Sequence, residues 1–114
     1  MLLEPGNKIH VITRRSFEAD TPRHFVGEVR DVSDALVSAE GYAFVRDPNR
    51  NEFVKRPERR VRILSLVDAA NVIFIIPQDV DLENVAYRQT EKQRWLVTDG
   101  KAFVLDITEF GGGR

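Results

Sequence analysis

The block from Val61 to Pro77 constrains the fold more than any other part of this 114-residue sequence. It holds two short apolar runs rich in Val, Ile, Leu and Phe, which flank a small polar hinge, Asp68 to Asn71, and Pro77 ends the second run. Short runs, dense β-branched residues and a terminating proline favour two strands over one long helix. The block predicts two strands that meet at a sharp bend in the middle of a sheet, and a single helical turn at the hinge fits equally well.

More strands are predicted before this block, separated by turn signals. Gly27 lies inside one of them, where it indicates either a bulge or a close backbone contact. Residues 47–51 combine Asp, Pro and Asn, which favour a turn for separate reasons, and this places a hairpin tip near Asn49. The segments with strand character are Ile9 to Thr13, Phe25 to Val29, Leu36 to Ser38 and Tyr42 to Arg46, the last two being interrupted at Glu40-Gly41.

After Pro77 the pattern favours a short helical turn and then a hairpin or three-stranded meander. Asp79 is a fitting cap for a turn over Asp79 to Val85. Asp99-Gly100 is typical of a two-residue type I′ turn between two strands. Roughly eight short strands predict an all-β domain, a small barrel or sandwich, whose edges are commonly closed by neighbouring subunits.

Composition and charge narrow the class of protein. The length fits one domain, and 42% hydrophobic with 31% charged residues is typical of a soluble globular protein. There is no Cys, which removes disulfides and thiolate chemistry, and no apolar stretch reaches the ~20 residues that cross a bilayer. The start lacks the features of a secretory signal, so we expect a cytoplasmic protein with no membrane partner. Residues 111–114 are expected to form a disordered tail.

Residues 8 to 77 resemble the Sm-like family, the small bent-strand barrels of the Sm and Lsm proteins. The matching segments are IHVIT, FVGEVRDV with its internal glycine, LVSAEGYAFV, and the closing pair LSLVDAANVIFIIP. The resemblance implies an SH3/Sm-like barrel over residues 1–77, with residues 78–110 added as a C-terminal β-hairpin extension of the same domain. It also implies a homo-oligomer, with a ring as one form, because the last strand of the family pairs with the next subunit.

The expected oligomer interface follows from the closing strand and from one aromatic residue. Val72, Phe74 and Ile76 lie on that strand. Trp95 is either an interface anchor, where Trp is enriched, or a cap on the barrel core. The usual RNA-gripping residues of the family are missing, since the matching places read Asp34-Ala35-Leu36-Val37 and Asp68 to Asn71.

Basic residues gather between positions 46 and 62, although 17 Lys and Arg against 18 Asp and Glu leave the whole chain at a net charge of −1. Such a cluster could follow nucleic-acid phosphates, with Tyr42 or Phe53 stacking on bases. The other interpretation is a solvated hairpin whose arginines pair with carboxylates. The predicted nucleic-acid-binding residues are Arg46, Arg50, Lys55, Arg56, Arg59 and Arg60, and Arg62 belongs to the same cluster.

Other chemistry has weaker support. His10 and His24 could face each other as a metal or acid–base pair, but no third ligand is spaced nearby, and cross-strand or surface histidines are favoured. Asp79, Asp81 and Glu83 alternate but lack the spacing of a calcium loop, which favours a solvated acidic connection. No nucleophile elbow or glycine-rich phosphate loop is present. We therefore expect no catalytic residues, metal or cofactor.

Three hypotheses follow from the sequence. The first is a non-enzymatic, homo-oligomeric Sm-like binding protein with RNA as a candidate partner through the basic cluster. The second is a structural or protein-interaction module on the same barrel, without nucleic-acid binding. The third is a small ligand-binding barrel or enzyme with His10, His24 and Asp31 in a pocket.

Overall fold

A computed structural model describes residues 2–14, 23–47, 49–68 and 70–108, and these are almost entirely β-structure. The prediction of an all-β domain is confirmed. The described elements are β1 Lys8–Thr13, β2 Arg23–Ser33, β3 Leu36–Asp47, β4 Glu52–Lys55, β5 Arg60–Ser65, β6 Asn71–Ile76, the 3-10 turn η1 Leu82–Asn84, β7 Ala86–Gln89, β8 Trp95–Thr98 and β9 Val104–Asp106. None of the helical structure in the described ranges is long and apolar enough to cross a membrane.

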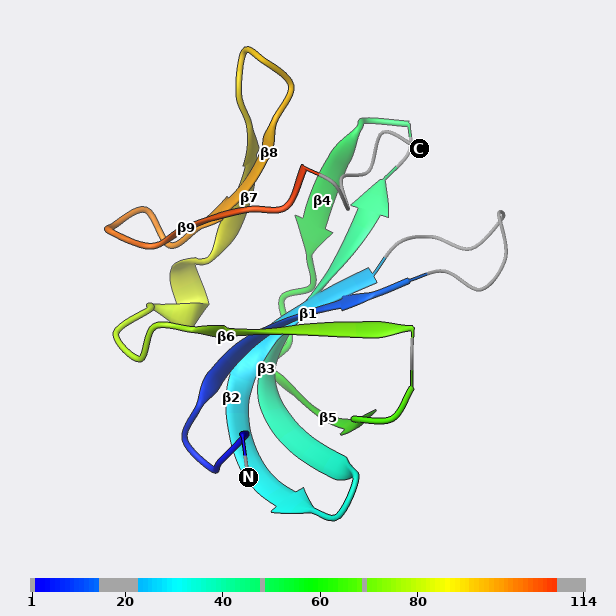
Figure 1. The fold of residues 1–114 in the computed structure, drawn as a ribbon. Helices are drawn as coiled ribbons and strands as arrows, with labels where there is room; N and C mark the ends of the chain where they lie inside the picture. Colours follow the sequence, from blue (N-terminus) through cyan, green and yellow to red (C-terminus); the bar gives the residue numbers. More distant parts are fainter. Residues whose placement is uncertain (1, 15–22, 48, 69, 109–114) are drawn as a thin grey trace.

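Six strands form one antiparallel sheet around the long strand β3 (Figure 1). β3 serves two partners along one side: its first half, Leu36 to Gly41, pairs with β5, and its last four residues pair with β4. On the other side the order continues β2, β1, β6. β5 and β6 are not hydrogen-bonded to each other, so the described strands form an open, curved sheet without barrel closure.

A pair of glycines allows the sheet to bend. Gly27 and Gly41 are directly opposite on β2 and β3. A Cβ on Gly41 would lie 1.9 Å from the Val26 carbonyl oxygen, and one on Gly27 would lie 2.7 Å from the Glu40 carbonyl oxygen, so neither position has space for a side chain. Of the two interpretations of Gly27, close backbone contact is the one observed. The register shift of β2 falls between Val29 and Asp31.

Two sequence expectations about strand limits need correction. β3 runs without a break through Glu40-Gly41, because Gly41 supplies close contact and not a turn. The block from Val61 to Pro77 does contain two strands, but they do not meet in the middle of a sheet. β5 pairs with β3 and β6 pairs with β1, which places them at different edges of the sheet.

The C-terminal part forms a second, three-stranded sheet in the order β7, β8, β9. The expected meander is confirmed, but the two-residue turn at Asp99-Gly100 is wrong. Thr98 pairs with Val104, which leaves a five-residue loop, and only Gly100 of the two has a positive φ (+79°). Asp99 is buried and accepts hydrogen bonds from the backbone N–H groups of Lys101 (2.9 Å) and Asp81 (3.1 Å), which ties the loop to the start of the extension.

Strand alternation divides the apolar side chains into two cores. The inner core lies on the concave face of the curved sheet and contains Leu3, Ile9, Val11, Phe25, Val29, Val37, Ala39, Ala43 and Leu64. The outer core joins the opposite face of that sheet to the C-terminal extension and contains Ile12, Val26, Tyr42, Phe44, Ile76, Val80, Leu82, Val85, Trp95, Val97, Phe103 and Ile107. The C-terminal extension is therefore a second layer that covers part of one face of the larger sheet, while Leu36, Val61 and Ile63 on the same face stay exposed.

Candidate anion-binding pocket

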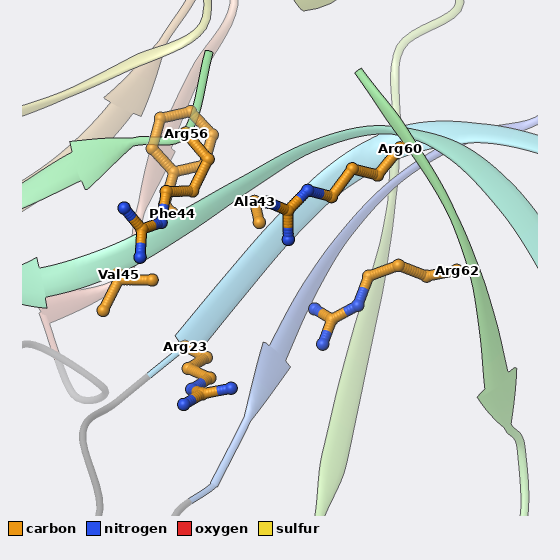
Figure 2. Close-up of a pocket in the computed structure, with 7 residues that line it drawn as sticks. All are labelled: Arg23, Ala43, Phe44, Val45, Arg56, Arg60 and Arg62. Atoms are coloured by element: carbon orange, nitrogen blue, oxygen red, sulfur yellow. The ribbon is translucent and has the colours of Figure 1, made fainter. Parts of the chain in front are cut away.

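A small pocket of about 140 Å³ opens beside the end of β3, and four arginines line it (Figure 2). Arg23 begins β2, Arg56 lies just after β4, and Arg60 and Arg62 belong to β5. Figure 2 shows the guanidinium groups of Arg23, Arg60 and Arg62 directed toward a shared space next to β3. The remaining lining comes from Ala43, Phe44 and Val45 of that strand.

Strand alternation explains why these arginines converge. Arg60 and Arg62 share one face of β5 with Leu64, because successive side chains alternate between faces. Leu64 is part of the inner core. On β2, Arg23 likewise shares the face of Phe25, another inner-core residue. The concave face of the sheet is therefore apolar in its interior and becomes a cluster of guanidinium groups at one open end.

Backbone pairing sets the width of this cluster. Arg60 is opposite Gly41 and Arg62 is opposite Ala39, whereas Arg23 is opposite Val45 on the other side of β3. The arginines of β5 and β2 thus flank β3 from both sides. The backbone N–H of Arg56 donates to the carbonyl oxygen of Ala43 at 2.8 Å, which fixes the β4–β5 connection beside the same strand.

The electrostatics of the pocket are unbalanced. Burial lowers the pKa of Arg62, and the positive charges of Arg23 and Arg60 lower it further. The Arg62 guanidinium lies 5.6 Å from the centre of the Phe25 ring, so part of its hydration is replaced by an aromatic face. Arginine cannot shed its proton at any ordinary pH, and the repulsion among these groups therefore persists. A bound anion would relieve it.

Only one carboxylate compensates this cluster among the described residues. Arg60 pairs with Glu58 at 2.8 Å, and both side chains are largely exposed. No ion pair links Arg23, Arg56 or Arg62 to a carboxylate in the described part of the chain. Among the described residues, Arg23 and Arg62 have no carboxylate partner, and Arg56 interacts with Glu58 only through its charge.

The pocket contains two of the six predicted nucleic-acid-binding residues, Arg56 and Arg60. Arg62, which belongs to the same sequence cluster, joins them. Arg23 was missed because it is more than thirty positions away along the chain, and only the pairing of β2 with β3 brings it there. Alternation with Phe25 was the one sequence signal that could have indicated its face.

The other four predicted residues point elsewhere and have partners. Arg46 donates to the Asn51 side chain at 2.5 Å, and Arg50 pairs with Glu52 at 3.1 Å near the hairpin tip. Two more cations cover the Tyr42 ring. Lys55 lies 4.1 Å from the ring centre and donates to the Glu83 carbonyl oxygen, while Arg59 lies 5.5 Å from the ring centre and pairs with Glu40 at 3.3 Å.

The aromatic rings expected to stack on bases are covered. Tyr42 is 8% exposed beneath its two cations. Phe53 packs against the outer core, where its ring stacks on Tyr87 at 4.4 Å and meets the edge of Trp95 at 5.3 Å. The pocket therefore offers guanidinium donors to a ligand but neither of these rings.

His10 and His24 do come together, and both are fully buried. Their rings meet edge to face, with centroids 5.5 Å apart. Each ring hydrogen-bonds the same hydroxyl of Tyr87: His10 Nε2 at 2.7 Å and His24 Nδ1 at 2.5 Å. Tyr87 belongs to β7, so this contact links the two sheets. The sequence favours surface or cross-strand histidines, and the structure shows the cross-strand arrangement; no sequence signal indicates Tyr87.

Burial determines the protonation of this group. It lowers the pKa of His10 to about 4, and burial together with the charge of His10 lowers the pKa of His24 to about 3. Both imidazoles are therefore neutral at pH 7. The Tyr87 hydroxyl donates to one imidazole and accepts from the other. The second nitrogens, His10 Nδ1 and His24 Nε2, have no hydrogen-bond partner among the described residues.

The described residues contain no cluster with the composition of a metal site. No three His, Cys, Asp or Glu side chains gather there. Asp31 is exposed and does not contact the histidine pair, which leaves the third sequence hypothesis without its carboxylate. Asp81 accepts hydrogen bonds from Asn84 (2.6 Å) and Lys101 (3.4 Å).

The four residues predicted for an oligomer interface face the chain's own outer core. Ile76 and Trp95 are buried in it, and Val72 and Phe74 pack against it. The alternate position on β6, Ile75, is 56% exposed. Val61 and Ile63 on β5 are 63% and 73% exposed. These three residues lie on the edge strands β5 and β6, and further exposed apolar side chains of the described residues are those of Leu2, Leu36, Val54, Val67 and Val104.

Comparisons with known proteins add no assignment: no family model, no curated protein and no solved structure matches this chain.

Proposed function

We propose that this chain is a non-enzymatic, Sm-like β-domain that binds single-stranded RNA through its phosphate groups, with the arginine pocket as the contact site. The observation that carries the proposal is that Arg23, Arg56, Arg60 and Arg62 line one concave space and that Glu58 is the only carboxylate in an ion pair with them among the described residues. Guanidinium groups match phosphate oxygens in a bidentate geometry, and this makes arginine the usual residue for phosphate recognition.

The same features define the kind of RNA binding expected. The chain has a net charge of −1, so no overall field attracts a polyanion and the local cluster must supply the attraction. Tyr42 and Phe53 are covered, and the family's base-gripping residues are absent from this sequence. Binding is therefore directed at phosphates, has little sequence preference and weakens steeply with salt.

Fluorescence anisotropy with a labelled single-stranded RNA of mixed sequence tests this function. The pocket variant is Arg23→Ala plus Arg62→Ala. The matched control is Arg50→Ala plus Arg88→Ala, which removes the same charge outside the pocket. We expect the pocket variant to lose about tenfold or more in affinity and to flatten the salt dependence by about two phosphate contacts. Equal losses in both variants, or no RNA binding by the natural chain, would overturn the proposal.

A second candidate function is a structural homo-oligomer without nucleic acid, and the sheet edges favour it. β5 and β6 each have a free edge among the described strands, and Val61, Ile63 and Ile75 are exposed there. Unpaired edges with apolar side chains are ready to pair with another copy. Light scattering behind a sizing column, at low and high salt, measures the mass. A salt-resistant oligomer that Ile63→Lys dissociates, and that carries no RNA, would favour this candidate, whereas a monomer would exclude it.

A further inference from the structure

We infer that the arginine pocket takes the terminal phosphate of a nucleic-acid strand, a phosphomonoester, in preference to an internal phosphodiester. This inference rests on the function proposed above and adds the chemical form of the ligand. It follows from three properties of the pocket: its charge, its size and its closed base.

The charge of the pocket matches a dianion. Four arginines line it, and Glu58 is the one carboxylate among the described residues that pairs with this cluster, through an ion pair with Arg60 and a weaker charge interaction with Arg56. An internal phosphodiester carries one negative charge, whereas a terminal phosphate carries about −1.5 to −2 at pH 7. Within the described part of the chain, four arginines and one carboxylate leave more positive charge than one phosphodiester would neutralise. A terminal phosphate neutralises more of it at the same position.

The size of the pocket fits one small group. Its volume of about 140 Å³ is well below the ~300–1,000 Å³ typical of sites that enclose a drug-sized molecule. A base with its sugar is larger than this space. The ligand therefore places a single anionic group inside and leaves the rest of its chain at the surface.

The closed base of the pocket favours a strand end. β3 closes one side of the pocket through Ala43, whose side chain is buried with the inner core. Arg62 lies over the buried ring of Phe25, where the inner core begins. An internal phosphodiester has two ester substituents, and both would have to leave through the same opening. A terminal phosphate has one, and its three free oxygens accept from more of the converging N–H donors.

The test compares RNA strands of one sequence that differ only at their ends: 5′-hydroxyl, 5′-phosphate, 5′-methylphosphate and 3′-phosphate. The methylphosphate retains the phosphorus at the same position but carries a single charge. Affinities are measured at pH 7.5 in 0.15 M salt by isothermal titration calorimetry. We expect one or both phosphate-ended strands to bind about tenfold or more tightly than the hydroxyl-ended strand, and the methylphosphate to lose most of that gain.

The same variants locate the effect. Arg23→Ala plus Arg62→Ala should abolish the advantage of the phosphate end, whereas Arg50→Ala plus Arg88→Ala should preserve it. If all four strands bind equally well, the end preference is overturned and phosphate-directed RNA binding remains. If none of them binds, the proposed function itself fails. Retention of the end preference in the pocket variant would place the terminal phosphate elsewhere and would also overturn the inference.

Discussion

Arg23 and His24 are neighbours on β2, yet they occupy opposite chemical environments. Arg23 faces the open, concave side of the sheet and joins three other arginines around the pocket. His24 faces the other side, where it is buried between the two sheets and bound to Tyr87. The alternation of a β-strand thus places a permanent charge at an open surface and a titratable group in a sealed core within two consecutive positions.

The two environments handle positive charge differently. A buried imidazole can lose its proton, and burial lowers the pKa of His24 far enough to keep it neutral. A guanidinium cannot lose its proton, so Arg23 and its neighbours stay charged and need water or a bound anion. The comparison separates a region that serves stability from a region suited to binding, and four experiments test that division.

The largest effect should come from acid. The pKa values of His10 and His24 are about 4 and about 3 in the folded chain, below the unfolded value of 6.5. The unfolded state therefore binds more protons below pH 6.5, so the stability is fully present above that pH and is lost as pH falls toward the folded values. At about 1.4 kcal/mol per pKa unit, the loss reaches several kcal/mol by pH 4. Urea unfolding at a series of pH values measures it.

The pH window identifies the groups responsible. Asp106 has its pKa lowered to about 2 by hydrogen bonds from Thr108 and by Arg94, so its contribution is lost only below pH 4. A decline that begins near pH 6.5 therefore belongs to the histidines. His24→Leu removes one titrating group and should make the decline shallower. A stability that stays constant from pH 8 to pH 5 would contradict the assignment of neutral, buried imidazoles.

Truncating the two neighbours on β2 compares the regions directly. His24→Ala removes a buried ring that packs on Phe53 (4.6 Å between centroids) and bonds Tyr87, and it should cost about 2–4 kcal/mol. Arg23→Ala removes an exposed side chain and should change stability by no more than about 0.5 kcal/mol. Chemical denaturation of both variants at pH 8 measures the difference. Similar losses in the two would show that the pocket is also structural.

The Tyr87 hydroxyl should account for an intermediate effect. Tyr87→Phe retains the ring that stacks on Phe53 and contacts Phe44, but it leaves one nitrogen of each imidazole without its hydrogen bond. Buried polar groups that lose a partner cost about 1–3 kcal/mol. We expect that loss in urea unfolding at pH 8, with RNA affinity unchanged. A neutral result would mean that water replaces the hydroxyl.

The sequence supported the fold class and most of the strands, because dense Val, Ile and Phe runs between turn residues leave few alternatives to β-structure. The predicted limits of strands and turns were wrong where a glycine is compatible with more than one local structure. The sequence predicts a break at Gly41, which is a close contact inside β3, and a tight turn at Asp99-Gly100, which lies in a longer loop. In each case a tertiary contact decided, and a single sequence does not reveal such contacts.

Only some of the pocket residues could be predicted from the sequence, again because tertiary contacts place the others. Arg56, Arg60 and Arg62 are close in sequence, and their local charge is visible without a structure. Lys55 and Arg59 lie outside the pocket and Arg23 lies inside it. Both facts depend on which face of its strand or connection each residue occupies. Register sets those faces, and a shift of one residue would reverse them. The contact of Tyr87 with the histidines could not be predicted from the sequence, because it forms only when the second sheet packs on the first.

The smallest effect tests whether the pocket stores repulsion. The Arg62 guanidinium lies over the Phe25 ring, and the positive charges of Arg23 and Arg60 both lower the pKa of Arg62. Arg62→Met retains an unbranched side chain that packs on an aromatic ring, and it removes the charge. We therefore expect stability to rise by a few tenths of a kcal/mol at low salt, as for other partly exposed charges, and the gain to shrink in 0.5 M salt as screening weakens the repulsion.

Arg50→Met, which breaks an exposed pair with Glu52, should show no such gain. If Arg62→Met lowers stability at low salt, the arginines of the pocket are held by interactions stronger than their mutual repulsion, and the division between a stabilising core and a binding surface does not hold at this position.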